Sequence, residues 1–464
     1  MTFQARDYQD AIIDQVRVKL RTVKRVLVQL PTGGGKTVVG GKMIESAAGK
    51  GHSCLFTVHR RELIDQTTET FDDVGIRHGI IASGRPYQVL ERVQVASIDT
   101  LKHRMNKGAN LFPPKFIMVD EAHHVGAAGW KAVLAAYPDA FVVGLSATPE
   151  RLDGRGLDDV FQEMVIGPST GWLIQNGFLS DYRAFAPGAP DMTGVTVRTG
   201  DYAKGETASL MDKPTITGDA IKHYQRLAMG QSAVCFCASI EHSQHVAEQF
   251  RQAGIMAWHL DGTTPGGERA EAIRAFRNGE IKVLSNVDLF GEGFDLPSLT
   301  ASILLRPTKS LALYLQQVGR CLRKHPGKDR ALILDHAGNI ARHGLPDEER
   351  DWSLKGKDKR KKGGAPLDAK QCPSCFLLHR PAPVCPECGH EYDRQPREIE
   401  HIDGELKEIN VKASRQQTAA EQAKAKSIED LTELGRKRGY RNPEAWAAHV
   451  FTARVAEERK RAAR

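Results

Sequence analysis

The stretch that most constrains the fold is a short apolar run followed by a glycine-rich turn and a helical segment. Residues 26–30 read Val-Leu-Val-Gln-Leu, residues 31–37 read Pro-Thr-Gly-Gly-Gly-Lys-Thr, and residues 38–48 favour a helix. Glycines let the backbone wrap closely around a polyphosphate, and the N–H groups at a helix start carry partial positive charge. The order of strand, glycine-rich loop and helix therefore predicts a nucleotide-binding loop in an α/β fold.

The side chains of this loop suggest separate tasks. Lys36 is expected to reach the β- and γ-phosphates, and Thr37 is expected to hold Mg²⁺. The usual phosphate-loop motif begins with a glycine six positions before its lysine, and this chain has Leu30 at that position. The residues expected to line the phosphates are Thr32, Gly33, Gly34, Gly35, Lys36 and Thr37.

Two adjacent acids follow a second apolar run. Residues 116–119 read Phe-Ile-Met-Val and lead directly into Asp120 and Glu121. Phosphoryl transfer needs one group to hold Mg²⁺ and another to orient and deprotonate water, so we assign these tasks to Asp120 and Glu121 in that order. His124 beside His123 raises a metal site as an alternative, yet a zinc site needs three or four converging ligands and no further Cys or His lies near in sequence.

The second half of the chain repeats the α/β rhythm. Strands are expected near residues 233–237, 257–260 and 281–284, with helices at 240–252 and 268–277 between them. Such alternation predicts a parallel sheet covered on both faces. In the helix expected at 311–323, Arg320 and Arg323 are three residues apart, so both guanidinium groups should leave one helix face and could neutralise a transferring phosphate.

Taken in order, the motifs between residues 3 and about 340 resemble those of superfamily 2 helicases and translocases of the DEAD/DEAH-box type. The region from Leu305 to Asn339 is most similar to the RadD-like bacterial and phage branch. The resemblance implies two RecA-like parallel-sheet domains that use ATP and Mg²⁺. It also implies an ATP-dependent DNA helicase or translocase in repair, recombination or phage replication, acting on single-stranded or branched DNA.

The resemblance also implies roles for individual residues. The catalytic set is Lys36, Glu121, Arg320 and Arg323, and Gln316 belongs to the same motif as the two arginines. Arg6 and Gln9 resemble an adenine clamp, and Gly293 and Asp295 a turn that senses the nucleotide. The residues implied to contact nucleic acid or to couple it to the ATP cleft are Arg60, Arg61, Ser146 and Thr148.

Four of the eight cysteines form a separate pattern. Cys372-Pro-Ser-Cys375 and Cys385-Pro-Glu-Cys388 are two Cys-x-x-Cys turns with nine residues between them. Four thiolates so spaced predict a closed, structural Zn²⁺ site in a zinc ribbon. Disulfides are the alternative, which the reducing interior of a cell disfavours. The other four cysteines lie in apolar or helical contexts typical of buried thiols.

Composition limits the partners. The net charge of +8 and the basic segment Lys355–Gly364 favour a polyanion, and single-strand-binding or recombination proteins are candidate further partners.

The tail is expected to be helical and basic, with a capped helix start at Ser427 and Asp430. Trp446, Val450 and Ala453 form an apolar stripe expected to dock on the core or a partner. No run of eighteen apolar residues occurs, which predicts a cytoplasmic protein of a bacterial or phage-infected cell without membrane contact.

The expected domains follow from these signals. They are a RecA-like ATP-binding domain at 1–165, a linker at 166–215, a RecA-like C-terminal domain at 216–350, a basic linker at 351–370, a zinc ribbon at 371–395 and a basic helical tail at 396–464. An RNA helicase, a chromatin-type remodelling motor and a partner-recruited DNA-binding remodeller with weak ATPase are the alternatives. A nuclease is disfavoured because no carboxylate cluster lies outside the ATP motifs.

Overall fold

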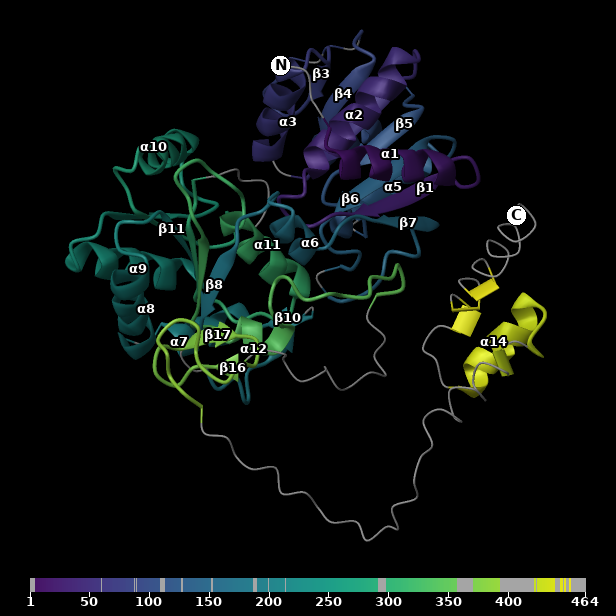
Figure 1. Ribbon diagram of the computed structural model, residues 1–464. Helices are drawn as coiled ribbons and strands as arrows, with labels where there is room; N and C mark the ends of the chain where they lie inside the picture. The colour runs from purple at the N-terminus through teal and green to yellow at the C-terminus, as the bar shows by residue number, and fades with distance from the viewer. Residues whose placement is uncertain are drawn as a thin grey trace. The chain divides into compact units, whose positions relative to one another are not determined.

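The computed structural model divides the chain into two compact units, Met1–Tyr392 and Asp393–Arg464. The residues that the structure describes are 5–59, 61–86, 88, 90–108, 113–126, 128–151, 153–186, 190–198, 200–212, 214–290, 298–356, 370–392, 421–422, 424–438, 443–444, 446–447 and 450–451. The first unit holds two α/β lobes, drawn purple to blue and teal to green in Figure 1.

The first lobe is built on a seven-stranded parallel sheet of order β3-β4-β2-β5-β6-β1-β7. Its strands are β1 (Arg25–Gln29), β2 (Cys54–Val58), β3 (Gly79–Ile81), β4 (Val93–Ser97), β5 (Phe116–Val119), β6 (Phe141–Ser146) and β7 (Glu163–Ile166). Its helices are α1 (Asp7–Lys19), α2 (Lys36–Gly49), α3 (Arg61–Asp73), α4 (Ile98–Asn106), the 3₁₀ turn η1 (Ala122–His124) and α5 (Ala128–Ala136). The near-continuous apolar strands are buried because helices cover both faces of the sheet.

Strand order brings the expected site residues to one edge of this sheet. β1 lies beside β6, with Gln29 opposite Ser146, and β6 lies beside β5, with Gly144 opposite Val119. The chain segments that leave the carboxyl ends of these three strands are therefore neighbours. This is the edge at which open α/β sheets bind their ligands.

The second lobe is built on an eight-stranded sheet of order β12-β13-β11-β14-β15-β8-β17-β16. Its strands are β8 (Tyr182–Phe185), β11 (Ala233–Phe236), β12 (Ala257–Leu260), β13 (Val283–Asn286), β14 (Ala301–Leu304), β15 (Ala331–Asp335), β16 (Lys370–Gln371) and β17 (Leu377–His379). Its helices are α8 (Pro214–Leu227), α9 (Ile240–Gln252), α10 (Gly266–Arg277), α11 (Leu311–Cys321) and α12 (Asn339–His343). The two RecA-like parallel-sheet domains expected from the sequence are thus confirmed.

The segment 166–215, expected to be a linker, contains secondary structure. It holds α6 (Thr170–Gln175), the short hairpin of β9 (Val197–Arg198) and β10 (Asp201–Tyr202), and α7 (Lys204–Met211). It also holds β8, which pairs in parallel with β15 and so belongs to the second sheet. β8 reads Tyr-Arg-Ala-Phe, and this mixture of polar and apolar residues gives no strand signal when read alone.

A strap at residues 343–356 returns from the second lobe to the first. Arg350 organises it by donating hydrogen bonds to four backbone carbonyls, those of His343, Leu345, Pro346 and Glu348. Farther along, the carbonyl oxygen of Leu354 accepts hydrogen bonds from the backbone N–H groups of Leu157 (2.6 Å) and Asp158 (3.1 Å) in the first lobe. The strap forms one wall of a cavity of about 400 Å³ that also borders β1 and α11.

The cysteine-rich module, residues 370–392, extends the second sheet. β17 pairs antiparallel with β8, and β16 pairs with β17. Cys372, Cys385 and Leu377 pack into the same apolar cluster as Phe185 of β8. The module is therefore continuous with the second lobe. Of the expected basic linker, residues 357–369 lie outside the described residues.

The second unit is described around α14 (Ile428–Lys437). Ser427 caps this helix in a capping box with Asp430, as the sequence predicted. Trp446 and Val450 pack against the small cluster that contains Leu431, so in the described part of the tail this stripe covers the tail's own helix. Ala453, expected in the same stripe, lies outside the described residues.

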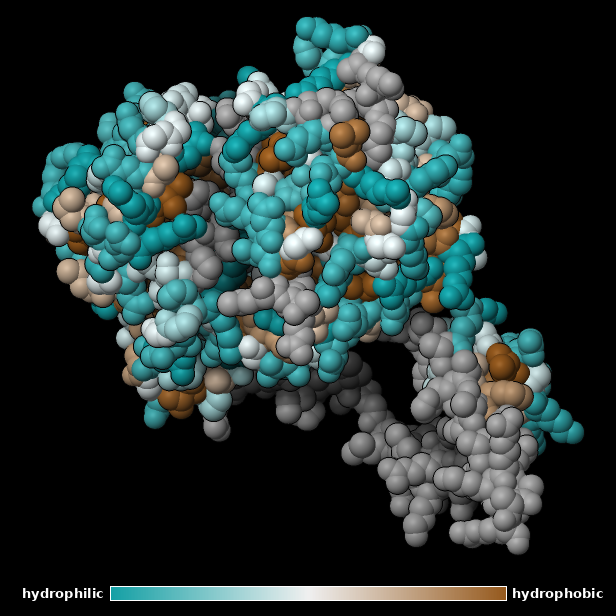
Figure 2. Space-filling model, turned by 90° about the horizontal axis from the view of Figure 1, so that it is seen from above, coloured by the Kyte–Doolittle hydropathy of each residue, from teal (hydrophilic) through white to brown (hydrophobic). Residues whose placement is uncertain are grey.

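The surface agrees with this burial of apolar strands. Figure 2 shows a largely hydrophilic face on which the hydrophobic residues form small separate groups. Within the described ranges, every helix is too short or too polar to span a lipid bilayer.

Candidate functional site

The glycine-rich loop joins β1 to α2 in the conformation that a phosphate loop needs. Gly33 and Gly35 have φ angles of 82° and 86°, a region that other residues rarely adopt. A Cβ atom at Gly34 would lie 2.8 Å from the side chain of Leu30, so the loop has no room for a larger residue there. Leu30, which replaces the usual first glycine of a phosphate loop, is fully buried, and its side chain packs against the loop at Gly34.

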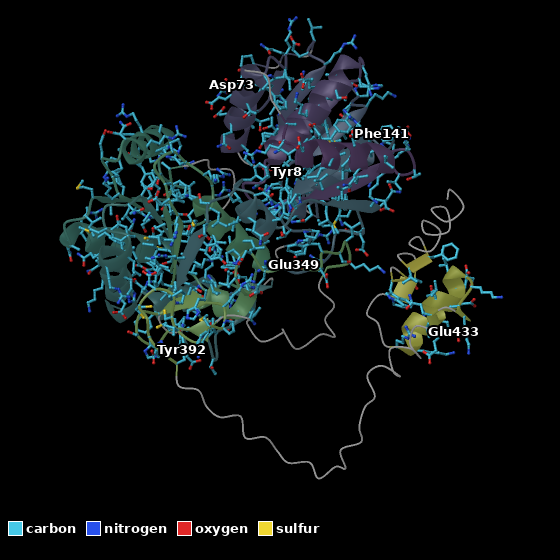
Figure 3. The ribbon with its side chains drawn as sticks, viewed as in Figure 1. Tyr8, Asp73, Phe141, Glu349, Tyr392 and Glu433 are labelled. Atoms are coloured by element: carbon cyan, nitrogen blue, oxygen red, sulfur yellow. The ribbon has the colours of Figure 1, made fainter. Side chains whose placement is uncertain are left out.

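The adenine-clamp candidates lie against this loop. The Gln9 side chain accepts a hydrogen bond from the Arg6 backbone N–H (3.0 Å) and donates one to the carbonyl oxygen of Gly34 (3.2 Å). An amide has two N–H donors and two lone pairs, so one donor and one acceptor position remain for a base edge. Tyr8 donates from its hydroxyl to the same carbonyl at 2.8 Å and is labelled in Figure 3.

The two acids follow β5 and face the loop lysine. Asp120 and Glu121 are both buried, and Oε1 of Glu121 lies 4.0 Å from Nζ of Lys36. Burial raises the pKa of Asp120, the Glu121 carboxylate raises it further, and Lys36 partly offsets both effects. Glu121 has a φ angle of 47°, a left-handed conformation that non-glycine residues adopt mainly where a site requires it.

The segment after β6 is linked to the acids through a histidine. The His123 ring lies 3.3 Å from the Ser146 hydroxyl and 3.5 Å from the Glu121 carboxylate. Ser146 in turn donates a hydrogen bond of 2.6 Å to the carbonyl oxygen of Thr148. Among the described residues, no hydrogen-bond partner lies near the buried Thr148 hydroxyl. These contacts give a continuous path from the water-activating candidate to the segment expected to couple the two sites.

Helix α11 of the second lobe and Arg323 beyond it lie against the phosphate loop. A Cβ atom at Gly319 of α11 would lie 2.5 Å from Cβ of Thr32, so the helix packs directly on the phosphate loop. The Cγ atom of Arg323 lies 3.5 Å from the place of a Cβ at Gly33. Burial lowers the pKa of Arg323 to about 10, and the Glu121 carboxylate partly offsets this. α11 ends at Cys321, earlier than expected, so Arg320 is helical and Arg323 follows the helix cap.

Gln316 supplies a test of whether the site fits a ligand. Its side chain is buried in α11, and neither its amide nitrogen nor its amide oxygen has a hydrogen-bond partner in the part of the chain that the structure describes. A buried amide without partners is costly, and a bound phosphate or water would satisfy it. Together with Lys36 and Thr37 at the start of α2, these groups fit a magnesium nucleotide.

Several expected site residues cannot be placed. Arg60, Gly293 and Asp295 lie outside the described residues, and only the backbone of Arg61 is described, at the start of α3. Sequence reasoning missed two contacts, the Tyr8 hydroxyl on the loop carbonyl and the link from His123 to Ser146. Tyr8 sits beside Gln9 in the sequence, which is a usable signal, whereas the second contact depends on strand order.

The four cysteines expected to bind zinc converge in the cysteine-rich module. Their Sγ atoms all lie within 4.8 Å of one another, with Cys372 and Cys388 at 3.5 Å and Cys375 and Cys385 at 3.7 Å. A tetrahedral Zn²⁺ site with Zn–S bonds of about 2.3 Å requires S–S separations of about 3.8 Å. The donor set therefore fits zinc. Figure 3 labels Tyr392, the last described residue of this module.

Two family models match separate parts of the chain. Residues 2–151 match the model described as "Type III restriction enzyme, res subunit". Residues 216–325 match the model described as "Helicase conserved C-terminal domain". The phosphate loop and the acids fall in the first match, and α11 falls in the second.

Three curated relatives match along most of the chain. A 51.5 kDa protein of a Lactococcus phage is 37% identical over 82% of both chains. IRC3 of Saccharomyces cerevisiae, which carries an ATP-dependent helicase name, is 32% identical over 72% of this chain, which spans 51% of the IRC3 length. A protein of Sulfurisphaera tokodaii named DNA 3'-5' translocase XPB2 is 24% identical over 71% of this chain and 80% of its own.

Solved structures share the fold. The restriction-modification enzyme LlaBIII, solved with DNA, matches 72% of this chain and 28% of its own at a TM-score of 0.54 and 19% identity. Dbp5 of Saccharomyces cerevisiae, solved with RNA and a nucleotide analogue, matches 71% of this chain and 85% of its own at a TM-score of 0.52 and 17% identity. At these identities the likeness concerns the arrangement of the two lobes alone.

Proposed function

Since this chain belongs to superfamily 2 of the helicases, a class of ATP-hydrolysing enzymes, we propose that it couples ATP hydrolysis to movement on or unwinding of DNA. The observation that carries the proposal is the meeting of two half-sites at one phosphate loop. Lys36 and Glu121 come from the first lobe, and Arg320 and Arg323 come from the second. A nucleotide between them would bridge the lobes.

Binding of the nucleotide falls mainly to the first lobe. Lys36 and the N–H groups at the start of α2 would hold the phosphates, while Thr37 and Asp120 would hold Mg²⁺. Gln9 would pair with the adenine edge through its remaining donor and acceptor, with Arg6 beside it. Mg²⁺ held by these two residues would supply positive charge against the charge that develops on the phosphates during transfer.

Hydrolysis needs both lobes. Glu121 would orient the attacking water and take its proton, since it is buried close to the loop. Arg320 and Arg323 would neutralise the γ-phosphate as it leaves, and Gln316 would hydrogen-bond beside it. Because the cations lie on the second lobe, turnover would change how tightly the lobes close, which is the usual origin of movement in such a cleft.

Coupling to the nucleic acid would run along the contacts at the sheet edge. Ser146 and Thr148 would transmit the state of the cleft through His123, and Arg60 and Arg61 would touch the nucleic-acid backbone. Gly293 and Asp295 would sense the nucleotide from the second lobe. The assignment of DNA is supported by the XPB2 relative, whose name describes a DNA translocase, and by the net charge of +8.

The finer parts of the proposal concern setting and partners. We place the chain in the RadD-like branch, with roles in repair, recombination or phage replication, inside a bacterial or phage-infected cell. The four cysteines would hold a structural Zn²⁺ that fixes the module on β8. Single-strand-binding or recombination proteins are the partners we propose for the module and tail.

The experiment that tests the function is ATP hydrolysis with single-stranded, duplex and forked DNA and with RNA of the same sequences. The proposal predicts strong stimulation by single-stranded or forked DNA and little by RNA, with Lys36→Ala as the inactive control. Stimulation by RNA alone would support the RNA helicase alternative. Turnover that no nucleic acid changes would favour a partner-activated remodeller.

A further inference from the structure

Lys328 lies just beyond the arginine-bearing helix and is bound in an unusual way. Its half-buried ammonium group donates hydrogen bonds to the backbone carbonyl oxygens of Arg323 (2.7 Å), Leu299 (2.7 Å) and Cys321. Within the described residues, no carboxylate forms an ion pair with it. The three donors of the ammonium group are therefore all given to backbone.

The three carbonyls belong to two places that matter for the site. Cys321 is the last residue of α11, and Arg323 is the second of the two arginines proposed to neutralise the γ-phosphate. Carbonyl groups at a helix end have no partners within the helix and carry partial negative charge, so a cation there is favourable. Leu299 lies just before β14 in the middle of the second sheet. Lys328 thus fastens the end of α11 and the backbone of Arg323 to the sheet.

A tight turn before Lys328 brings this side chain back to the end of α11. Gly327 has a φ angle of 79°, and the Lys328 N–H donates 3.1 Å to the carbonyl oxygen of His325, which closes a tight turn after Arg323. The backbone of Arg323 is also held by the segment between α6 and β8, because Leu179 forms a β-bridge with it. Its backbone is therefore fixed from two directions while its side chain extends to the phosphate loop.

Burying the charged ammonium group of Lys328 costs electrostatic free energy that a neutral hydrogen-bond donor at the same place would not. The pKa of Lys328 is lowered to about 8, because burial and the nearby guanidinium of Arg323 outweigh the opposing effect of Cys321. A neutral side chain with two donors would satisfy most of the same carbonyls at less cost. A cation at this place instead adds positive charge next to the backbone of Arg323.

We propose that Lys328 is a positioning residue for ATP hydrolysis, which sets the backbone of Arg323 so that its guanidinium reaches the γ-phosphate. The inference rests on the proposed function of the cleft. It assigns to Lys328 no contact with the nucleotide. Its loss should therefore leave nucleotide binding largely intact and slow the chemical step, since small misplacements of a catalytic group are costly.

The test compares five variants of the full chain in DNA-stimulated ATP hydrolysis. Lys328→Met should lower kcat about tenfold and change the KM for ATP by less than about threefold. Lys328→Gln keeps two donors, so its kcat should lie between those of Lys328→Met and the wild type. Lys328→Gln also replaces Lys328→Met in the comparison if the Met variant does not fold. Lys222→Met, an exposed lysine of α8, is the matched control. The fourth variant is Arg323→Ala alone, and the fifth combines it with Lys328→Met.

The double variant separates positioning from general support of the fold. If Lys328 acts through Arg323, adding Lys328→Met to Arg323→Ala should cost no further activity. Two results would overturn this inference and leave the proposed function standing. One is the same tenfold loss from Lys328→Met in the wild type and in Arg323→Ala, and the other is a kcat for Lys328→Met within about twofold of the wild type. Absence of turnover in both the wild type and Lys222→Met would remove the proposed function and this inference with it.

Discussion

The two halves of the cleft are charged differently. In the first lobe a cation and two buried acids share one site, with Lys36 Nζ 4.0 Å from Glu121 Oε1. At the end of α11 in the second lobe, Arg320, Arg323 and Lys328 have the same sign. A site of mixed charge can hold a magnesium nucleotide by itself, whereas a cluster of cations gains most when a polyanion arrives. The comparison teaches that nucleotide binding and water activation belong to the first lobe, and neutralisation of the transferring phosphate to the second.

Glu121→Gln should have the largest effect on turnover. The amide keeps the shape and burial of the side chain but cannot accept the proton from water, so kcat should fall about 10³-fold. Nucleotide binding should persist, which fluorescence titration with a labelled ATP analogue would measure. Glu268→Gln on the exposed face of α10 is the control. Undiminished turnover in the Glu121 variant would remove the assigned base.

Arg323→Ala should distinguish most clearly between the kinetic contributions of the two lobes. Because this cation acts on charge that develops during transfer, kcat should fall about 10²-fold while the KM for ATP changes little. Steady-state kinetics at saturating DNA measures both quantities. An equal loss in binding and turnover would mean that the second lobe also serves to hold the ground-state nucleotide, and the division of labour would fail.

Cys375→Ser should affect the second lobe and spare the first. The cysteine-rich module pairs with β8, so loss of one thiolate should weaken Zn²⁺ binding and lower the Tm of this lobe by about 5 °C. Elemental analysis and scanning calorimetry would report metal content and melting. Cys54→Ser, in β2 of the first lobe, is the comparison, and it should leave the metal content unchanged. A wild type purified without zinc and indifferent to added zinc would contradict the site.

Gln9→Ala should give the smallest change. Removing one amide that contacts the phosphate loop and is proposed to pair with the adenine edge should cost about 1 kcal/mol, which raises the KM for ATP about fivefold. The preference for ATP over GTP should shrink by a similar factor, which competition assays would show. A variant with unaltered base preference would place adenine recognition elsewhere.

The first half-site could be predicted in most of its parts from the sequence. Its residues lie in contiguous stretches, residues 31–37 and Asp120-Glu121, each attached to a strong strand signal. The meeting of these stretches also follows from the rule that parallel strands present ligands at their carboxyl ends. The pattern around Arg320 identified the second half-site for the same reason.

What could not be predicted depends on contacts between distant segments. The pairing of β8 with β17 joins the cysteine-rich module to the second sheet, and no local pattern encodes it. The strap at 343–356 reads as an irregular polar stretch, yet its backbone carbonyls are gathered by Arg350 and its end binds the first lobe. Lys328 likewise looks like one more basic residue until its three carbonyl partners are seen.

The central claim, that the two half-sites convert ATP hydrolysis into movement on DNA, is tested most directly by displacement of a triplex-forming strand from duplex or partly single-stranded DNA. The account predicts displacement by the wild type with ATP and Mg²⁺, and none with a non-hydrolysable analogue or with Glu121→Gln. Displacement that does not require hydrolysis, or DNA-stimulated hydrolysis without displacement on any of these substrates, would contradict it.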